Sequence, residues 1–212
     1  MKLFKLLVIF MLLLNGCSRK SFDLESFIDS RLEFAARQYK LMEASLPDTL
    51  MPRSINEKGE LITSNTRWWC SGFYPGTLWY LYEHSRDEEL LRIAQRRTML
   101  IEPEKYNTCT HDLGFMLYCS FGNGLRLTGN KAYEEILLTG AQSLLTRYND
   151  VVGCIRSWDH GNWQFPVIID NMMNLEFLFW AAEKSKDKTI YNKCLSHADR
   201  TRKEHFRPDF ST

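Results

Sequence analysis

Two aspartates with aromatic neighbours are the residues of this sequence best suited to chemistry. Asp170 lies in the strongly apolar run 167–180, and Asp112 follows Thr110 and His111 at the start of another apolar stretch. A carboxylate among apolar residues is costly to bury unless it is paired or protonated, and burial raises its pKa. A carboxyl group that keeps its proton near neutral pH can act as a general acid, so both aspartates are candidates for proton transfer.

Both aspartates also have a purely structural interpretation as helix N-caps. Asp170 comes shortly after Pro166 and beside Asn171, and Asp112 lies where a helix is predicted to begin. An N-cap carboxylate accepts hydrogen bonds from the backbone N–H groups of the first turn. The two roles are compatible, and the sequence leaves both open.

Aromatic residues accompany the two aspartates. Trp69 and Trp158 each belong to a polar and aromatic motif. His160 lies in the motif of Trp158, whereas His111 lies beside Asp112. Aromatic faces stack on sugar rings, and a pair of carboxyl groups on either side of a glycosidic bond is what hydrolysis of that bond requires. The alternative is that the indoles belong to the core and the histidines are hydrogen-bonded structural residues, with Asp159 in a turn.

The spacing of apolar residues predicts a helix over 22–45, followed by three tandem helical hairpins. The hairpins cover residues 71–101, 112–148 and 170–206. Each consists of a very apolar helix, a short turn and a more polar helix. The turns contain Asp87, Asn130 and Asp187.

Hairpins with an apolar first helix and a polar second helix indicate two layers, in which the first helices are buried inside and the second helices are half exposed. The fold class is therefore all-α, a toroid or solenoid of helical hairpins. We expect a loop over 47–66, almost no strands, and at most a short hairpin in the insertion 154–164. The starts of the inner helices meet at one end of such a fold, which would bring the polar and aromatic motifs together.

The first residues have the pattern of a lipoprotein signal peptide. Lys2 and Lys5 precede an apolar run over 6–14, which is too short for a comfortable membrane span, and Cys17 follows a small residue. We expect cleavage after residue 16 and lipidation of Cys17, with the protein anchored in the periplasm or cell envelope. The alternative is an ordinary secretory signal that ends beside a cysteine.

Composition excludes several other classes of protein. With 27 basic and 26 acidic residues and no basic run, the sequence gives no reason to expect nucleic acid as a partner. The five cysteines after Cys17 have no CxxC spacing, so we interpret them as mostly buried apolar residues, and an oxidising compartment allows one disulfide. We find no nucleotide or metal motif and expect no cofactor and no metal.

Four strings of residues carry a family resemblance: WWCSGFYPGTLW, THDLGFM, SWDHG and IIDNMMNLEFLFWA. In this order and spacing they resemble the unsaturated glucuronyl hydrolases, glycoside hydrolase family 88. The resemblance implies an (α/α)6 barrel. It also implies removal of the unsaturated uronic acid that polysaccharide lyases leave at the non-reducing end of glycosaminoglycan fragments, by protonation of C4 and hydration of C5 of its double bond.

The resemblance also assigns roles to particular residues. Asp170 matches the general acid/base and Asp112 the second carboxylate. Trp69 matches an aromatic residue lining the sugar site, while Trp158 and His111 adjoin matched positions and are expected to contact the substrate. Because the family barrel has more helices than this sequence, residues 17–212 correspond to roughly the N-terminal half of the toroid, incomplete at the C-terminus. Two alternatives remain: an unsaturated rhamnogalacturonyl hydrolase acting on pectin fragments, and an inactive truncated sugar-binding lipoprotein.

Overall fold

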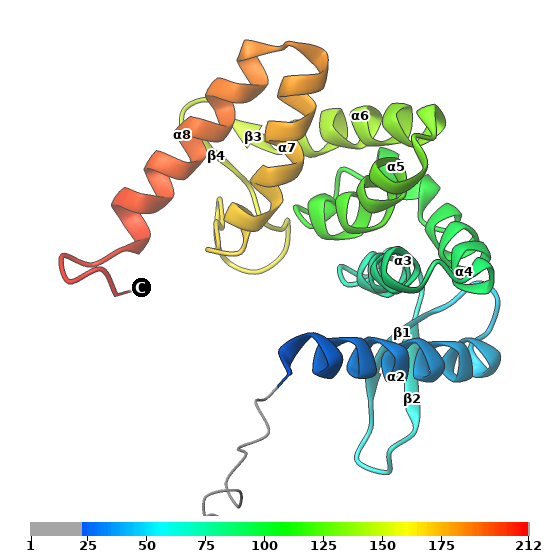
Figure 1. The fold of residues 1–212 in the computed structure, drawn as a ribbon. Coiled ribbons are helices and arrows are strands. Elements are labelled where there is room, and N and C mark those ends of the chain that lie inside the picture. Colours follow the sequence, from blue (N-terminus) through cyan, green and yellow to red (C-terminus); the bar gives the residue numbers. More distant parts are fainter. Residues whose placement is uncertain (1–22, 212) are drawn as a thin grey trace, which may run out of the picture.

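The computed structural model describes residues 23–211, and they fold into helices that follow one another along an arc (Figure 1). The first helix, α2, spans Leu24–Ser45. The helices of the three hairpins are α3 Phe73–Ser85 and α4 Glu88–Met99; η2 Gly114–Gly122, α5 Asn123–Thr128 and α6 Lys131–Leu145; and α7 Asn171–Ser185 and α8 Lys188–His205. A 3-10 helix, η1 Glu102–Tyr106, links the first hairpin to the second.

The turns inside the hairpins confirm the sequence prediction. Asp87, Asn130 and Asp187 are the N-caps of α4, α6 and α8, and each side chain accepts a backbone N–H of the first turn. The helices before α4 and α8 end at a residue in the left-handed conformation, with φ 55° at Arg86 and 58° at Lys186. A helix that ends in this way reverses within a few residues, so the two helices of a hairpin pack against each other.

The two-layer arrangement is also confirmed. The apolar helices α3, η2 and α7 pack side by side, and α4, α6 and α8 each pack against the outside of their own hairpin. Glycines allow the inner helices to approach closely: a Cβ on Gly76 would lie 2.8 Å from the carbonyl oxygen of Cys119, and one on Gly114 would lie 2.5 Å from Oδ1 of Asn174. The core lies between the layers and includes Trp79, Phe121 and Phe177.

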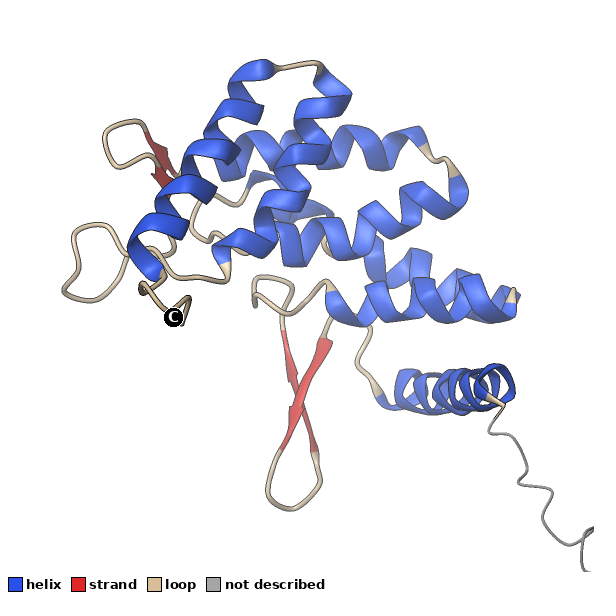
Figure 2. Ribbon diagram, turned by 60° about the vertical axis from the view of Figure 1, so that its left-hand side comes forward, coloured by secondary structure: helices blue, strands red, loops and turns tan. Residues whose placement is uncertain are grey.

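The expected loop over 47–66 contains a β-hairpin, which the sequence did not predict. Strand β1, Met51–Ile55, pairs antiparallel with β2, Leu61–Ser64, and the hairpin projects from the helices (Figure 2). The side chain of Asn56 accepts the backbone N–H groups of Lys58 and Glu60 and so closes the turn. Apart from Met51 these strands have few buried positions, so they lack the alternation of apolar and polar residues that identifies a strand in a sequence.

The insertion before α7 is also arranged differently from the prediction. Its short hairpin pairs β3, Tyr148–Asn149, with β4, Cys154–Ile155, so it begins before Cys154. Residues 156–170 form an irregular loop that leads to α7. This loop carries the SWDHG string, and its backbone therefore positions the aromatic residues without a regular element.

Three further expectations concern cysteines and membranes. The five cysteines within residues 23–211 are free: Cys154 and Cys194 are buried, Cys70 and Cys119 are half-buried, and Cys109 is exposed. Across that same range, we find no helix with both the length and the apolar character needed to span a bilayer. The predicted signal peptide, residues 1–16, and the lipidation site Cys17 lie outside the described residues.

Candidate functional site

His111, Asp112 and Asp170 come together at the starts of two inner helices. One nitrogen of the imidazole and one oxygen of each carboxyl group all lie within 4.8 Å of one another. His111 and Asp112 shortly precede η2, and Asp170 immediately precedes α7. The close packing of η2 on α7 at Gly114 and Asn174 therefore brings two motifs that are distant in sequence into one cluster.

Asp170 occupies the N-cap position of α7 without acting as a cap. Its backbone has φ −65° and ψ −19°, which is already helical, and its side chain accepts no hydrogen bond from the first turn. The carboxyl group is 37% exposed, and Oδ1 lies 3.2 Å from Nε2 of His111. Of the two roles that the sequence left open, this geometry favours a carboxyl group that is available for chemistry.

Asp112 does not cap η2 either and is the more buried of the two carboxyl groups. Its side chain is 13% exposed, Oδ2 accepts the hydroxyl of Thr110 at 2.6 Å, and Oδ1 lies 3.4 Å from Nε2 of His111. Burial raises the pKa of Asp112 above its ordinary value; His111 and the Thr110 hydroxyl oppose this rise, and the neighbouring Asp170 adds to it. The sequence suggested that Asp170 would lie among apolar walls, whereas the more strongly desolvated carboxyl is Asp112.

His111 connects the two carboxyl groups, and its surroundings define where its protons lie. Nδ1 is 2.6 Å from the carbonyl oxygen of Ser157. A carbonyl can only accept, so Nδ1 carries a proton and donates it. Nε2, which faces both carboxyl groups, then either carries a proton and donates it, or accepts a hydrogen bond from a protonated carboxyl group. Nε2 of His111 thus lies within reach of both carboxyl groups and connects them.

Trp158 lies beside this cluster, on the loop before α7. Its ring centroid is 6.3 Å from that of His111, and the ring stacks on His160 at 5.6 Å. Trp163 meets it edge-on at 6.2 Å and is 63% exposed. The indole Nε1 of Trp158 is buried and has no hydrogen-bond partner in the described part of the chain. The loop thus presents a group of rings at the edge of the acid cluster.

Trp69 belongs to a second aromatic group, at the start of α3. Its ring meets Phe73 at 5.7 Å and Phe115 at 6.1 Å, and the indole is 45% exposed. A cavity of 380 Å³ adjoins Phe73 and Phe115 and extends over Met172 and Glu176 of α7. Phe115 is three residues from Asp112, and Met172 is two residues from Asp170, so this mostly apolar cavity lies next to the acids.

Three residues that sequence reasoning did not single out support the cluster: Ser157, Asn171 and Asn174. Ser157 Oγ accepts the backbone N–H of Ile168 and the side-chain amide of Asn171, each at 3.0 Å. Asn174 Oδ1 accepts the backbone N–H of Phe115 at 3.1 Å. The only signal in the sequence was that these polar residues interrupt or adjoin apolar runs, and this pattern does not reveal which distant backbone atoms they bind.

The side chains of His111, Asp112 and Asp170 are also spaced as ligands of a cation would be, since one atom from each lies within 4.8 Å of the others. The sequence predicts no metal, and that expectation stays a prediction. The residues around the cluster support proton sharing directly, because Ser157 fixes the proton on Nδ1 of His111 and thereby directs Nε2 at the carboxyl groups.

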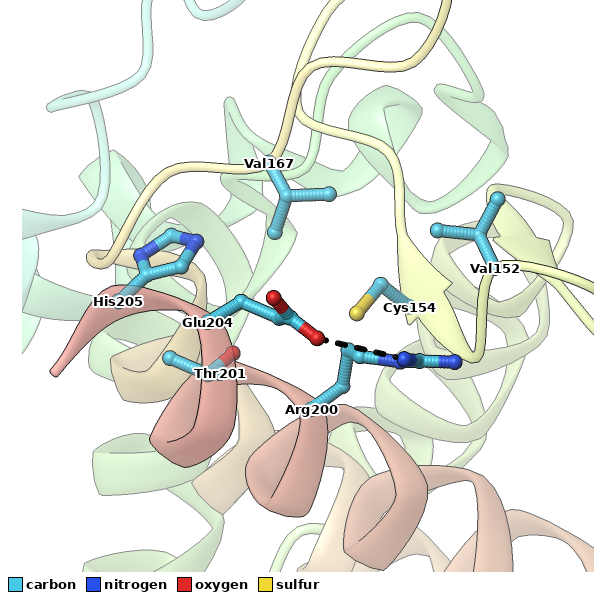
Figure 3. A pocket seen from close by; sticks show the side chains of 7 residues that line it. All are labelled: Val152, Cys154, Val167, Arg200, Thr201, Glu204 and His205. Carbon is cyan, nitrogen blue, oxygen red and sulfur yellow. Dashed lines mark hydrogen bonds and ion pairs between the residues drawn. The ribbon is translucent and has the colours of Figure 1, made fainter.

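A second cavity lies between the loop around β3 and β4 and the end of α8, with Val167 of the loop before α7 in its lining. It measures 340 Å³, and its lining includes Cys154, Thr201 and His205 (Figure 3). Its one carboxylate, Glu204, forms an ion pair with Arg200 at 3.4 Å. This cavity lacks the pair of carboxyl groups that the predicted chemistry requires, so the candidate site is the cluster around His111.

Inner and outer helices in hairpins define a helical-toroid protein with a cluster of acids and aromatic rings at the starts of its inner helices. No family model matches the chain. It is 44% identical over 179 residues to an unsaturated glucuronyl hydrolase of Formosa agariphila, a match that covers 82% of this chain and 45% of that protein. An unsaturated chondroitin disaccharide hydrolase of Streptococcus pneumoniae is 30% identical over 141 residues, which are 64% of this chain and 35% of that protein.

Comparison with solved structures identifies the same kind of relative. The crystal structure of an unsaturated glucuronyl hydrolase specific for heparin has 44% sequence identity and a TM-score of 0.85, over 89% of this chain and 51% of that chain. The chain belongs to the family of unsaturated glucuronyl hydrolases. It spans about half the length of the first of these relatives, which fits an N-terminal portion of the family fold. The predicted fold class, a toroid of helical hairpins, is thereby confirmed, while the prediction that residues 17–212 are its N-terminal half stays a prediction.

Proposed function

We propose that the whole protein is a glycoside hydrolase that removes unsaturated uronic acid from the non-reducing end of oligosaccharides made by polysaccharide lyases. One observation carries the proposal: His111 lies between two carboxyl groups that are 58 residues apart in sequence, with Nε2 3.2 Å from Asp170 and 3.4 Å from Asp112. Acid–base chemistry needs carboxyl groups that exchange protons and do not merely cap helices. Similarity to unsaturated glucuronyl hydrolases over 82% of the chain supports the same conclusion.

In the proposed reaction, Asp170 delivers a proton to C4 of the C4=C5 double bond of the substrate. Positive charge then develops at C5 and is shared with the ring oxygen. Water attacks C5, and its proton returns to the carboxylate of Asp170. The resulting hemiketal opens and releases the rest of the oligosaccharide. The greater exposure of Asp170 suits direct contact with substrate.

We assign the remaining groups of the cluster to supporting roles. Asp112 is the second carboxylate, and it assists and orients Asp170 through His111. The Thr110 hydroxyl and burial fix the position of the Asp112 side chain. Trp69 and Trp158 line the sugar site with His111. Aromatic faces of this kind supply stacking surfaces for pyranose rings.

Glycosaminoglycan fragments are the proposed substrates, with heparin fragments the first choice because a relative with 44% identity is described as specific for heparin. The test is loss of the ultraviolet absorbance of the conjugated C4=C5 bond. The protein expressed from its complete gene is incubated with unsaturated heparin, chondroitin and hyaluronan disaccharides. Loss of absorbance with any of them supports the proposal. Loss with pectin-derived unsaturated rhamnogalacturonan fragments alone indicates the alternative hydrolase, and no loss with the whole set contradicts the proposed activity.

We further propose that the protein is a lipoprotein of the periplasm or cell envelope. The support is the run of Lys2, Lys5 and apolar residues before Cys17. Growth with radiolabelled fatty acid should label the protein, and Cys17→Ser should prevent the labelling and release the protein from the membrane fraction. Labelling that survives this substitution would contradict the assignment of Cys17.

A further inference from the structure

A buried arginine joins the two loops that carry the candidate acids. Arg147 lies between α6 and β3, and its side chain is 4% exposed. Nε donates to the carbonyl of Arg156 at 2.8 Å, and Nη1 donates to the carbonyl of Thr108 at 2.5 Å. Nη1 and Nη2 also bind the two oxygens of Asp159 at 2.8 and 3.3 Å. One guanidinium thus binds the loop before η2 and the loop before α7.

Both of these loops lead directly to the acid cluster. Thr108 is two residues before Thr110, whose hydroxyl binds Asp112. Arg156 is next to Ser157, whose carbonyl accepts Nδ1–H of His111. The position of Arg147 therefore affects both the orientation of His111 and the position of the carboxyl group of Asp112.

The chemistry of the contacts requires an arginine. A guanidinium is planar and offers five donors in a fixed fork, whereas an ammonium offers a single charge with rotating donors. In this protein the fork contacts two carbonyl oxygens and both oxygens of one carboxylate. A lysine could supply the charge but could not reach all of these acceptors at once. Asp159, which the sequence suggested was a turn residue, is the side chain that anchors its loop to this fork.

We propose that Arg147, held by Asp159, is a positioning residue that aligns His111 between Asp112 and Asp170 for proton transfer. The proposal rests on the proposed hydrolase function. Arg147 acts through the backbone of residues 108 and 156–157, and its charge also opposes the rise in the pKa of Asp112. Loss of Arg147 should therefore lower kcat selectively. A misplaced acid reduces stabilisation of the transition state more than it reduces substrate binding.

The test compares three variants of the protein expressed from its complete gene. Arg147→Met should lower kcat about 10- to 100-fold while KM changes less than about threefold. Arg147→Lys should keep the protein folded yet recover little of the lost kcat. Asp159→Ala leaves the carbonyl contacts of Arg147 in place and should lower kcat in the same sense but less.

Arg126→Met is the matched control. Arg126, in α5, also makes a forked pair with a carboxylate, that of Glu83 in α3, at 2.6 and 2.7 Å, but it binds neither of the loops that lead to the acids. This variant should leave kcat unchanged. An equal fall of kcat in Arg126→Met and Arg147→Met would overturn the positioning role, because it would indicate a general effect of losing an arginine fork. If Arg147→Met does not fold, Asp159→Ala decides, and unchanged kcat in that variant also overturns the proposal.

A second readout does not depend on activity. In protein labelled with ¹⁵N-histidine, the Nδ1–H proton of His111 should give a downfield NMR signal protected by its bond to Ser157, and Arg147→Lys and Asp159→Ala should weaken that protection. A signal unchanged in both variants contradicts the proposal. A wild-type protein that acts on no substrate overturns the proposed hydrolase function, whereas the NMR result still shows whether Arg147 orders His111.

Discussion

Nε2 of His111 lies 3.2 Å from Oδ1 of Asp170, although 59 residues separate the two along the chain. The same nitrogen lies 3.4 Å from Oδ1 of Asp112, and the opposite ring nitrogen donates to Ser157. A neutral imidazole that donates from Nδ1 to Ser157 has no N–H left for either carboxyl group, so its Nε2 can only accept a hydrogen bond from a protonated one. One imidazole nitrogen therefore links the two aspartates, and a change at either carboxyl group alters the hydrogen bonding of the other.

The first prediction concerns the accessible acid. Asp170→Asn keeps the size of the side chain and removes its proton donor, so turnover of unsaturated disaccharides should fall by about 10²- to 10⁴-fold. Binding of the disaccharide, measured by calorimetry, should persist because the aromatic walls are untouched. Asp199→Asn, the same substitution at an exposed position of α8, is the control and should change neither quantity. Turnover retained in Asp170→Asn would remove this residue from the proposed role.

The buried acid leads to a prediction about stability. Burial raises the pKa of Asp112 in the folded protein. The folded state therefore binds more protons than the unfolded state between the ordinary and the raised pKa, and stability falls as pH rises through that window. Asp112→Asn removes the charge and keeps an acceptor for the Thr110 hydroxyl.

This variant should consequently melt at a higher temperature than the wild type at neutral pH, and at the same temperature at a pH below the ordinary pKa of aspartate. Thermal unfolding followed by circular dichroism at both pH values measures the effect. Activity should be lost at the same time, because the variant lacks the second carboxyl group. A gain of stability with a loss of activity is the usual trade-off at sites that bind or react. A variant that is less stable than the wild type at neutral pH would contradict the expected sign of the effect.

The helical hairpins could be predicted from the sequence because their signals are local. Apolar spacing located the helices, and Asp87, Asn130 and Asp187 marked the start of each outer helix. The pairing of Asp112 with Asp170 followed from the repeated design, since inner helices that begin with a motif must gather those motifs at one end.

Contacts between backbone and distant side chains could not be predicted in this way. Arg147 binds the carbonyls of Thr108 and Arg156, and no pattern of residue types identifies the carbonyl that a guanidinium will reach. The same holds for Ser157, whose role is to present a carbonyl that any residue possesses. The hairpin of β1 and β2 was missed for another reason: its residues are mostly exposed, so the period of two is not visible.

A third prediction concerns a histidine outside the acid cluster. His197 is fully buried in α8, and its Nδ1 accepts the backbone N–H of Ile155 at 2.9 Å. Burial, with smaller contributions from His205 and His111, lowers its pKa to about 4. The unfolded state therefore takes up a proton near pH 6.5 that the folded state does not bind until about pH 4. Stability should fall by roughly 3 kcal/mol as pH drops through this window.

His197→Asn should flatten that dependence, because the asparagine oxygen can accept the Ile155 N–H and does not titrate. Urea unfolding at several pH values between 4 and 7 measures how stability depends on pH. His160→Asn, at an exposed position in the loop before α7, is the control. An equally steep acid dependence in His197→Asn would assign the effect to other groups.

The fourth prediction tests the close packing of the inner helices. A Cβ on Gly72 would collide with the carbonyl oxygens of Phe115 and Met116, which are backbone atoms that cannot move without shifting η2. A Cβ on Gly140 would collide with Cδ1 of Leu117, the end of a buried side chain that can shift more easily than a backbone can. Gly72→Ala should therefore destabilise the protein by about 3 kcal/mol, while Gly140→Ala should destabilise it by only about 1 kcal/mol because alanine also favours the helix.

The midpoints of urea unfolding for the two variants give this comparison directly. Gly72→Ala should also lower turnover, because Phe115 lies close to Asp112 and moves with η2. Equal stability of the two variants would show that the backbones of α3 and η2 have room to separate, and that the spacing of the acid cluster does not depend on Gly72.

The last prediction separates proton transfer from metal chemistry at the cluster of His111, Asp112 and Asp170. These side chains present one atom each within 4.8 Å, so they could receive a cation as well as a proton. If they act as proton carriers, dialysis against a chelator should leave turnover unchanged. Added Zn²⁺ should instead inhibit, because a cation that binds Nε2 and the carboxylate oxygens displaces the shared proton. The inhibition should be reversed by chelator and weakened in acid, where the ligands are protonated. Loss of activity on chelation, restored by one particular metal, would replace the proton-transfer assignment with a metal-dependent one.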